Sequence, residues 1–256
     1  MKRKKWAVLF FAFSLILVLL AIGQNLINPI KKDSVSVLTI YCAAGLGAPV
    51  EVLSREYEEL HGIKVELIYG SSGDLRTQIK SQGKGDIYIP GDPRFLEEID
   101  YTMAQKIAYH FPVLIVNNTE ADNLKTLPDL ANSDLSFILV KPDSTALGLL
   151  TEEIMSGIGL DQDLDHRLYG RVATANQVPL YLSLGRGGAG ICWYSNYLLY
   201  ENELIIIDLP IHLQKQVPII GVVLSSSQNS EKAWKFLHYL QSERAKEVFI
   251  DWGYRL

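Results

Sequence analysis

The chain has 256 residues, of which 48% are hydrophobic and 21% are charged, and this is the composition of an ordinary globular protein. The length allows one large domain or two lobes of about 100 residues each. Acidic residues outnumber basic residues by 29 to 24, which argues against nucleic acid or an anionic membrane surface as the binding partner.

The first 23 residues differ from the rest of the chain. Four basic residues at positions 2–5 precede an apolar run at 6–22 that only Ser14 interrupts. This order predicts export, with the segment acting either as a cleaved signal peptide or as a retained membrane anchor. Ala21 and Gly23 fit a cleavage site after Gly23, whereas the run is longer than most signal cores and shorter than a comfortable membrane span. Both alternatives stay open.

The exported part begins with residues 24–36, which are polar, lack periodicity and are predicted to form a linker. No Cys lies near position 24, so a lipid anchor at that point is not expected. We expect the remainder to work in the periplasm or at the outer face of the cytoplasmic membrane. Without the four basic residues at 2–5, 20 basic residues stand against 29 acidic ones, which gives a net charge near −9.

Two cysteines, Cys42 and Cys192, lie at the ends of apolar runs far apart in the sequence. In an exported protein an even number of cysteines is compatible with one disulfide. The alternative is that both are buried and behave as small hydrophobic residues. The sequence leaves both interpretations open.

From residue 37 the chain alternates between predicted strands and helices. Strands are predicted at 37–42, 65–69 and 86–89, because each is a short apolar run bounded by small or polar residues. Between the first two, Val50, Leu53 and Tyr57 recur at helical spacing. This β-α-β-α-β order with short connections is typical of a parallel, doubly wound sheet.

A second alternation follows a predicted strand at 111–116, where the chain is expected to leave the first lobe. Further strands are expected at 135–140, 171–174, 191–194, 204–207 and 217–224, and further helices at 146–158, 161–169, 178–184, 230–240 and 243–250. We therefore predict an α/β fold of two lobes, each a mostly parallel sheet flanked by helices. Residues 37–112 and 213–256 would form the first lobe, and residues 113–212 the second.

The turn after the second strand, Gly70 to Asp74, joins a buried strand to a helix. Ser72 stands where a helix N-cap belongs, and the two glycines let the backbone come close to a ligand. Because the start of a helix has free N–H groups and the positive end of the dipole, such a turn can hold an anion. A capped strand-to-helix connection without a ligand is the other interpretation of this stretch.

Five motifs occur in a characteristic order along the chain. They are IYCAAGL at 40–46, YGSSGDL at 69–75, GDIYIPGD at 85–92, PDSTALG at 142–148 and GICWYS at 190–195. This order, over residues 37–256, resembles the molybdate-type substrate-binding proteins of ABC importers. The resemblance implies the two-lobed periplasmic-binding-protein fold of type II. It also implies that an oxyanion is held between the lobes by hydroxyls, backbone N–H groups and a tyrosine.

The ligand-binding positions implied by this resemblance can be placed on the chain one at a time. They are Gly45, Ser72 or Ser71, Ala146 with Thr145 before it, Val178, and Trp193 with Tyr194 beside it. Two of them depart from the family, since Gly45 replaces a serine and Trp193 falls on the tyrosine position. These departures leave room for another cargo, such as a ferric ion or a small organic anion.

The resulting hypothesis is an exported, monomeric solute-binding protein that is not an enzyme and has no cofactor. It would bind a molybdate-like or tungstate-like oxyanion, with no metal site beyond such a ligand, and deliver it to the membrane permease of an ABC importer. Two other classes stay open: a membrane-tethered sensor or accessory ectodomain, and an enzyme that uses Cys42. The five histidines lack metal-ligand spacing, and most are expected to be solvated.

Overall fold

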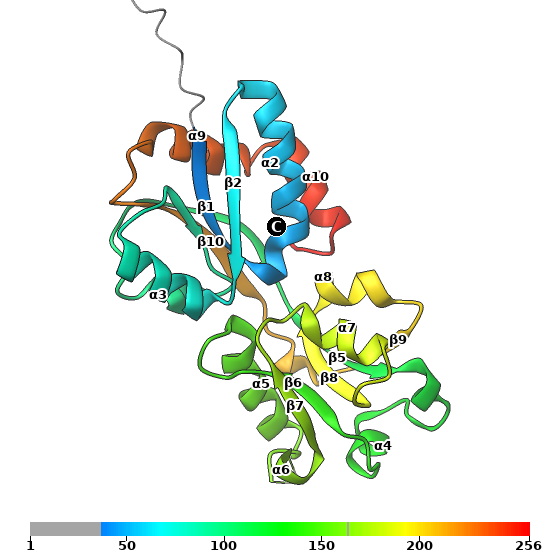
Figure 1. Cartoon of the computed structure of the whole chain (residues 1–256). Helices are drawn as coiled ribbons and strands as arrows, with labels where there is room; N and C mark the ends of the chain where they lie inside the picture. Colours follow the sequence, from blue (N-terminus) through cyan, green and yellow to red (C-terminus); the bar gives the residue numbers. More distant parts are fainter. Residues whose placement is uncertain (1–36, 163) are drawn as a thin grey trace, which may run out of the picture. The chain divides into compact units, whose positions relative to one another are not determined.

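The computed structural model describes residues 37–162 and 164–256, so the predicted signal or anchor at 1–23 and the linker at 24–36 lie outside the described residues. Within the described ranges, no helix has both the length and the apolar character needed to cross a membrane. Two five-stranded sheets organise this part of the chain (Figure 1).

The first sheet forms the first lobe, and its strands come from both ends of the described chain. Its members are β1 (Val37–Ala43), β2 (Lys64–Gly70), β3 (Ile87–Ile89), β4 (Tyr101–His110) and β10 (Val217–Leu224). The spatial order is β2-β1-β3-β10-β4. Strand β1 pairs in parallel with β2 and β3, whereas β10 runs antiparallel to β3 and β4.

The second sheet has the same plan and forms the second lobe. Its members are β5 (Pro112–Asn117), β6 (Phe137–Val140), β7 (Leu168–Val172), β8 (Ala189–Trp193) and β9 (Leu204–Ile207), in the order β7-β6-β8-β5-β9. Strand β6 is parallel to β7 and β8, and β5 is antiparallel to β8 and β9. The predicted two-lobed α/β fold is confirmed. The sheets are not mostly parallel as predicted, because each has two parallel and two antiparallel strand pairs and is therefore mixed.

Helices flank both sheets. In the first lobe they are α2 (Gly47–His61), α3 (Ser72–Gln82), α9 (Ser230–Tyr239) and α10 (Glu243–Asp251). In α2 the predicted face of Val50, Leu53 and Tyr57 is buried, and the helix ends at Gly62, whose φ of 64° lies in the left-handed region that glycine adopts most easily. The apolar face of α9 packs with α2, so the C-terminal helices complete the core of the first lobe.

In the second lobe the described residues form the helices α4 (Leu127–Ala131), α5 (Ala146–Gly157), α6 (Leu164–Arg167), α7 (Gln177–Ser183) and α8 (Tyr194–Tyr197). Of these, α5 is the one long helix, and the others have seven residues or fewer. The described residues of the two lobes also contain five 3₁₀ turns: η1 (Ala44–Leu46), η2 (Pro93–Leu96), η3 (Asn118–Asn123), η4 (Leu198–Tyr200) and η5 (Ile211–Leu213).

Two further sequence predictions need correction. The ten-residue strand β4 was missed, although it forms the long antiparallel pair with β10. The helix expected at 161–169 is only the single turn α6, because the chain then extends into β7 beside β6. The strand expected at 171–174 accordingly begins earlier and ends at Val172.

The two cysteines lie in different sheets, Cys42 in β1 and Cys192 in β8, and both are buried and free. Of the two interpretations, the structure has the buried small residue and not the disulfide. Burial raises the pKa of both thiols far above the ordinary value, so both stay protonated and chemically inert.

Candidate functional site

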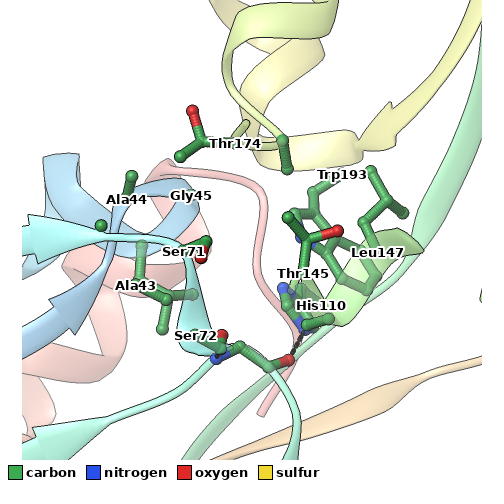
Figure 2. Close-up of a pocket in the computed structure, with 15 residues that line it drawn as sticks. Ala43, Ala44, Gly45, Ser71, Ser72, His110, Thr145, Leu147, Thr174 and Trp193 are labelled. Atoms are coloured by element: carbon green, nitrogen blue, oxygen red, sulfur yellow. Dashed lines mark hydrogen bonds between the residues drawn. The ribbon is translucent and has the colours of Figure 1, made fainter. Parts of the chain in front are cut away.

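One cavity is lined by residues that follow strands of both sheets (Figure 2). The first lobe contributes the turn at 43–46 after β1, the turn at 70–72 after β2, Gly91 and His110. The second lobe contributes residues 145–147, Thr174, Ala175 and Trp193. The free space is small, since the centre of a water-sized sphere can occupy about 20 Å³ of it.

The starts of two long helices meet at this cavity, one from each lobe. Ser71 is the N-cap of α3, and its Oγ accepts a hydrogen bond from the backbone N–H of Asp74 at 3.1 Å. Thr145 is the N-cap of α5, and its Oγ1 accepts one from Gly148 at 2.9 Å. Each cap fixes a helix start whose remaining N–H groups have no partner within the helix. The cavity therefore faces two positive ends of helix dipoles.

The hydroxyl groups of Ser72 and Thr145 are used differently. Ser72 Oγ accepts a hydrogen bond from the N–H of Gly91 at 3.1 Å, which leaves its own proton for a ligand. Thr145 Oγ1 donates to the carbonyl of Lys141 at 2.8 Å while it accepts from Gly148. The hydroxyl of Thr145 is thus committed to its own loop, and its role is to place the N–H groups of Ala146 and Leu147.

His110 is the one titratable side chain that lines the cavity. The other four histidines are exposed, as expected for most of the five, whereas His110 is buried. It is 1% exposed, its Nε2 lies 2.7 Å from the carbonyl oxygen of Gly91, and its ring stacks on Trp193 with centroids 3.5 Å apart. Burial lowers the pKa of His110 to about 3, opposed by the hydrogen bond to Gly91 and the charge of Asp92. The imidazole is therefore neutral.

Gly45 and Trp193, the two departures from the family pattern, face each other across the cavity. A Cβ on Gly45 would lie 3.3 Å from Cδ1 and 3.7 Å from Nε1 of Trp193, so the indole N–H stands beside the glycine. The carbonyl of Gly45 accepts hydrogen bonds from Asn196 Nδ2 at 3.2 Å and from the Tyr254 hydroxyl at 2.9 Å. The indole of Trp193 therefore occupies the space beside Gly45 into which a serine side chain would extend.

Six of the eight predicted site residues line this cavity. They are Gly45, Ser71, Ser72, Thr145, Ala146 and Trp193. Val178 does not, because it is buried in α7 and its N–H donates to the carbonyl of Ala175. Tyr194 lines a second cavity instead, where it stacks on Phe111 with ring centroids 4.9 Å apart.

Sequence reasoning missed three further lining features: His110, Gly91, and the pair Thr174 and Ala175. His110 ends the unrecognised strand β4, so the signal that could have found it is the apolar run at 107–116. Thr174 and Ala175 lie two to three residues before the start of α7. The resemblance to the family had placed the binding position of this helix start at Val178.

No Asp, Glu, Lys or Arg belongs to the fifteen residues that line the cavity. In addition, residues 37–162 and 164–256 contain no group of three or more His, Cys, Asp or Glu side chains that could hold a metal ion. The nearby Asp92 caps η2 and pairs with Arg94. The arrangement can thus offer a ligand N–H and O–H donors without formal charge.

A family model and several known proteins match the chain. The model described as bacterial extracellular solute-binding protein covers residues 38–255. A Bacillus subtilis protein, provisionally assigned as an ABC transporter substrate-binding lipoprotein, is 26% identical over 98% of each chain. The molybdate-binding protein ModA of Escherichia coli is 20% identical over 86% of this chain and 89% of its own.

Solved structures agree on the fold and differ in their ligands. The periplasmic molybdate-binding protein of Azotobacter vinelandii has a TM-score of 0.76 at 16% identity, over 86% of this chain and 99% of its own. The binding protein AfuA of Actinobacillus pleuropneumoniae, with fructose-6-phosphate bound, scores 0.71 at 14% identity over 87% and 85%. Iron-bound HitA of Pseudomonas aeruginosa scores 0.61 at 16% identity over 84% of both chains.

Proposed function

The chain belongs to the bacterial extracellular solute-binding proteins, and from this premise we propose that it binds a small oxyanion of the molybdate or tungstate kind. The anion would lie in the cavity between the lobes and be delivered to the membrane permease of an ABC importer. Residues 1–23 would direct the export that this role requires. The protein would bind its cargo and leave it chemically unchanged.

The observation that carries the proposal is a cavity lined by donors and free of charged side chains. An anion is stabilised there by the starts of α3 and α5, the turn at 44–46 and the Ser71 and Ser72 hydroxyls. These groups are held in place by their own hydrogen bonds, so binding needs little reorganisation. Each charge-assisted hydrogen bond contributes about 1.5–3 kcal/mol, and several together offset the dehydration of a dianion.

The same lining argues against two other cargoes. A ferric ion needs carboxylate or phenolate oxygens, and neither kind of side chain lines this cavity. A sugar phosphate also needs hydrogen-bond acceptors for its hydroxyl groups, and no Asp or Glu carboxylate lines this cavity. A compact tetrahedral anion fits the donor chemistry of this lining.

Fluorescence titration of the purified protein tests the proposal. Trp193 lines the cavity, so a saturable change in tryptophan emission with molybdate or tungstate at micromolar concentration is expected, with none for sulfate. Trp193→Phe should remove most of this signal, whereas Trp252→Phe, in the C-terminal segment, should keep it. If molybdate, tungstate, sulfate and phosphate all leave the emission unchanged, and calorimetry detects no binding heat, the proposed cargo class is wrong.

A further inference from the structure

One hydrogen-bond acceptor stands in a cavity that otherwise offers donors. The carbonyl oxygen of Gly91 can only accept, so the nitrogen of His110 that lies 2.7 Å from it, Nε2, carries the ring proton. Nδ1 of the neutral ring therefore has a free lone pair. Among the described residues this buried Nδ1 has no hydrogen-bond partner. Figure 2 shows the ring between Ser72 and Trp193, at the cavity wall.

The ring is held so that Nδ1 cannot easily turn away. The bond to Gly91 fixes one edge, and Trp193 covers a face, with the two planes 19° apart. Gly91 is itself held by Ser72, because its N–H donates to Ser72 Oγ. The acceptor is thus built into the same hydrogen-bond network as the Ser72 hydroxyl, one of the donors of the turn.

Such an acceptor conflicts with a bare oxyanion, because both partners present lone pairs. The conflict is removed when one proton lies between them. We propose that the cavity binds its oxyanion together with one proton, held between Nδ1 of His110 and a ligand oxygen. This inference rests on the proposed function and adds to it the protonation state of the ligand.

The surroundings of His110 support a proton that arrives only with the ligand. Burial keeps the pKa of His110 low in the empty cavity, at about 3. Asp92 is the carboxylate whose charge acts on His110, and both of its oxygens accept hydrogen bonds from Arg94. Tyr254, whose ring centroid lies 6.5 Å away, is neutral because burial raises its pKa, and its hydroxyl donates to Gly45. Trp193 and Ser72, which also face the ring, do not titrate in this range.

The consequence is a rule for ligand class. Molybdate is fully ionised near neutral pH and must draw a proton from solution, which His110 then shares with it. Hydrogenphosphate brings its own O–H, which can donate directly to Nδ1. The two anions should therefore differ by one proton in the overall binding reaction.

Isothermal titration calorimetry in two buffers of different ionisation enthalpy measures this proton. With molybdate at pH 7, we expect uptake of about one proton per anion bound, and a Kd that rises about tenfold per pH unit between pH 6 and 8. With phosphate at pH 8, uptake should be close to zero if it binds. His110→Gln should abolish the uptake with molybdate, and His238→Gln, on an exposed position of α9, should leave it intact.

Two further measurements keep the result decisive. If the His110→Gln protein does not fold, as judged by circular dichroism, the ¹⁵N resonances of His110 in the natural chain report the same event, since Nδ1 should change to the protonated form on addition of molybdate. Molybdate binding with no proton uptake overturns this inference and leaves the proposed function standing. Failure of molybdate, tungstate and phosphate to bind at all overturns both.

Discussion

Ser72 combines two roles that are usually separate in a binding site. Its Oγ accepts a hydrogen bond from the N–H of Gly91 and so links the start of α3 to the loop after β3. The hydroxyl proton of Ser72 remains available to a ligand in the cavity. Ser72→Ala should raise the Kd for the oxyanion by about 10- to 100-fold, because one charge-assisted hydrogen bond of about 1.5–3 kcal/mol is lost. Calorimetry gives the value. Ser81→Ala, an exposed hydroxyl of the same helix, should leave the Kd unchanged, and an equal loss in both variants would contradict the role of Ser72.

His110 should also make the stability of the unliganded protein depend on pH. Its pKa is about 3 in the folded chain and about 6.5 in an unfolded one, so below pH 6.5 the unfolded state binds more protons. The contribution of this residue is fully present above pH 6.5 and is lost as the pH falls toward 3, at up to about 1.4 kcal/mol per pH unit.

Denaturant unfolding of the natural chain and of His110→Phe at pH 7 and pH 5 tests this. The phenylalanine keeps a ring against Trp193 and cannot titrate, so its stability should be lower at pH 7 but should fall less toward pH 5. Equal losses in the two proteins over this interval would show that His110 does not titrate in the unfolding reaction.

The candidate site could be predicted from sequence only where a residue lies in a short turn between a strand and a helix. Ser71, Ser72, Thr145 and Ala146 all have this local signature, and all of them line the cavity. His110 could not be predicted in this way, because it reaches the cavity through long-range pairing of β4 with β10. Tyr194 shows the converse error, since one step along the chain after Trp193 turns its side chain into a different cavity.

At the scale of elements, the N–H groups at the helix starts bind the oxyanion. The effect of a helix cap on stability should be distinguishable from its effect on the affinity for the oxyanion. Thr145 caps α5 at the cavity, and Thr126 caps α4 away from it, each with its Oγ1 on a backbone N–H. Either Thr→Ala change should lower the free energy of unfolding by about 0.5–2 kcal/mol. Only Thr145→Ala should also weaken oxyanion binding, because the N–H groups of Ala146 and Leu147 lose their fixed direction.

Thermal unfolding and calorimetry on the two Thr→Ala proteins provide the comparison. The expected pattern is two similar losses of stability and a single loss of affinity. Weaker binding in Thr126→Ala would mean that overall destabilisation, and not the direction of the α5 start, governs the affinity.

The parallel strands could be predicted from sequence, and β4 could not, for a physical reason. Strand β3 is buried and apolar throughout, β1 is so from Ile40 onward, and the helices between them have a clear period. The outer half of β4 contains Thr102, Gln105 and Lys106, and only its end is buried. The backbone hydrogen bonds of β4 are formed with β10, more than a hundred residues later in the chain, so no local sequence pattern predicts this strand.

At the scale of the whole described chain, the two lobes meet through glycines. The N–H of Gly73 in α3 donates to the carbonyl of Ser144 at 2.8 Å, and a Cβ on Gly91 would lie 3.0 Å from the Cβ of Ala146. The backbone passes between the lobes at Phe111 and again between η5 and β10. Contacts between glycine and backbone let the lobes approach closely, which leaves the small cavity suited to a compact ion.

Gly73→Ala tests whether this approach is needed for binding. The added Cβ would lie 3.0 Å from Cα and 3.1 Å from the carbonyl oxygen of Ser144, so the lobes must separate slightly. Alanine is a better helix former than glycine, so the free energy of unfolding should stay level or rise by up to about 1 kcal/mol. We expect the lobes to close on the ligand by a hinge motion, so that this contact forms fully only in the liganded state. The Kd for molybdate should rise by at least about fivefold, because overpacking of this kind costs about 1–3 kcal/mol in that closed state.

The matched control is Gly170→Ala, in β7, where an added Cβ meets nothing within 4 Å. Calorimetry gives both affinities, and small-angle X-ray scattering with saturating molybdate gives both radii of gyration. Gly73→Ala should remain more extended than the control, since the contact with Ser144 blocks the last part of closure. A Gly73→Ala protein that binds as tightly and contracts as fully as the control would show that the lobes close without this contact.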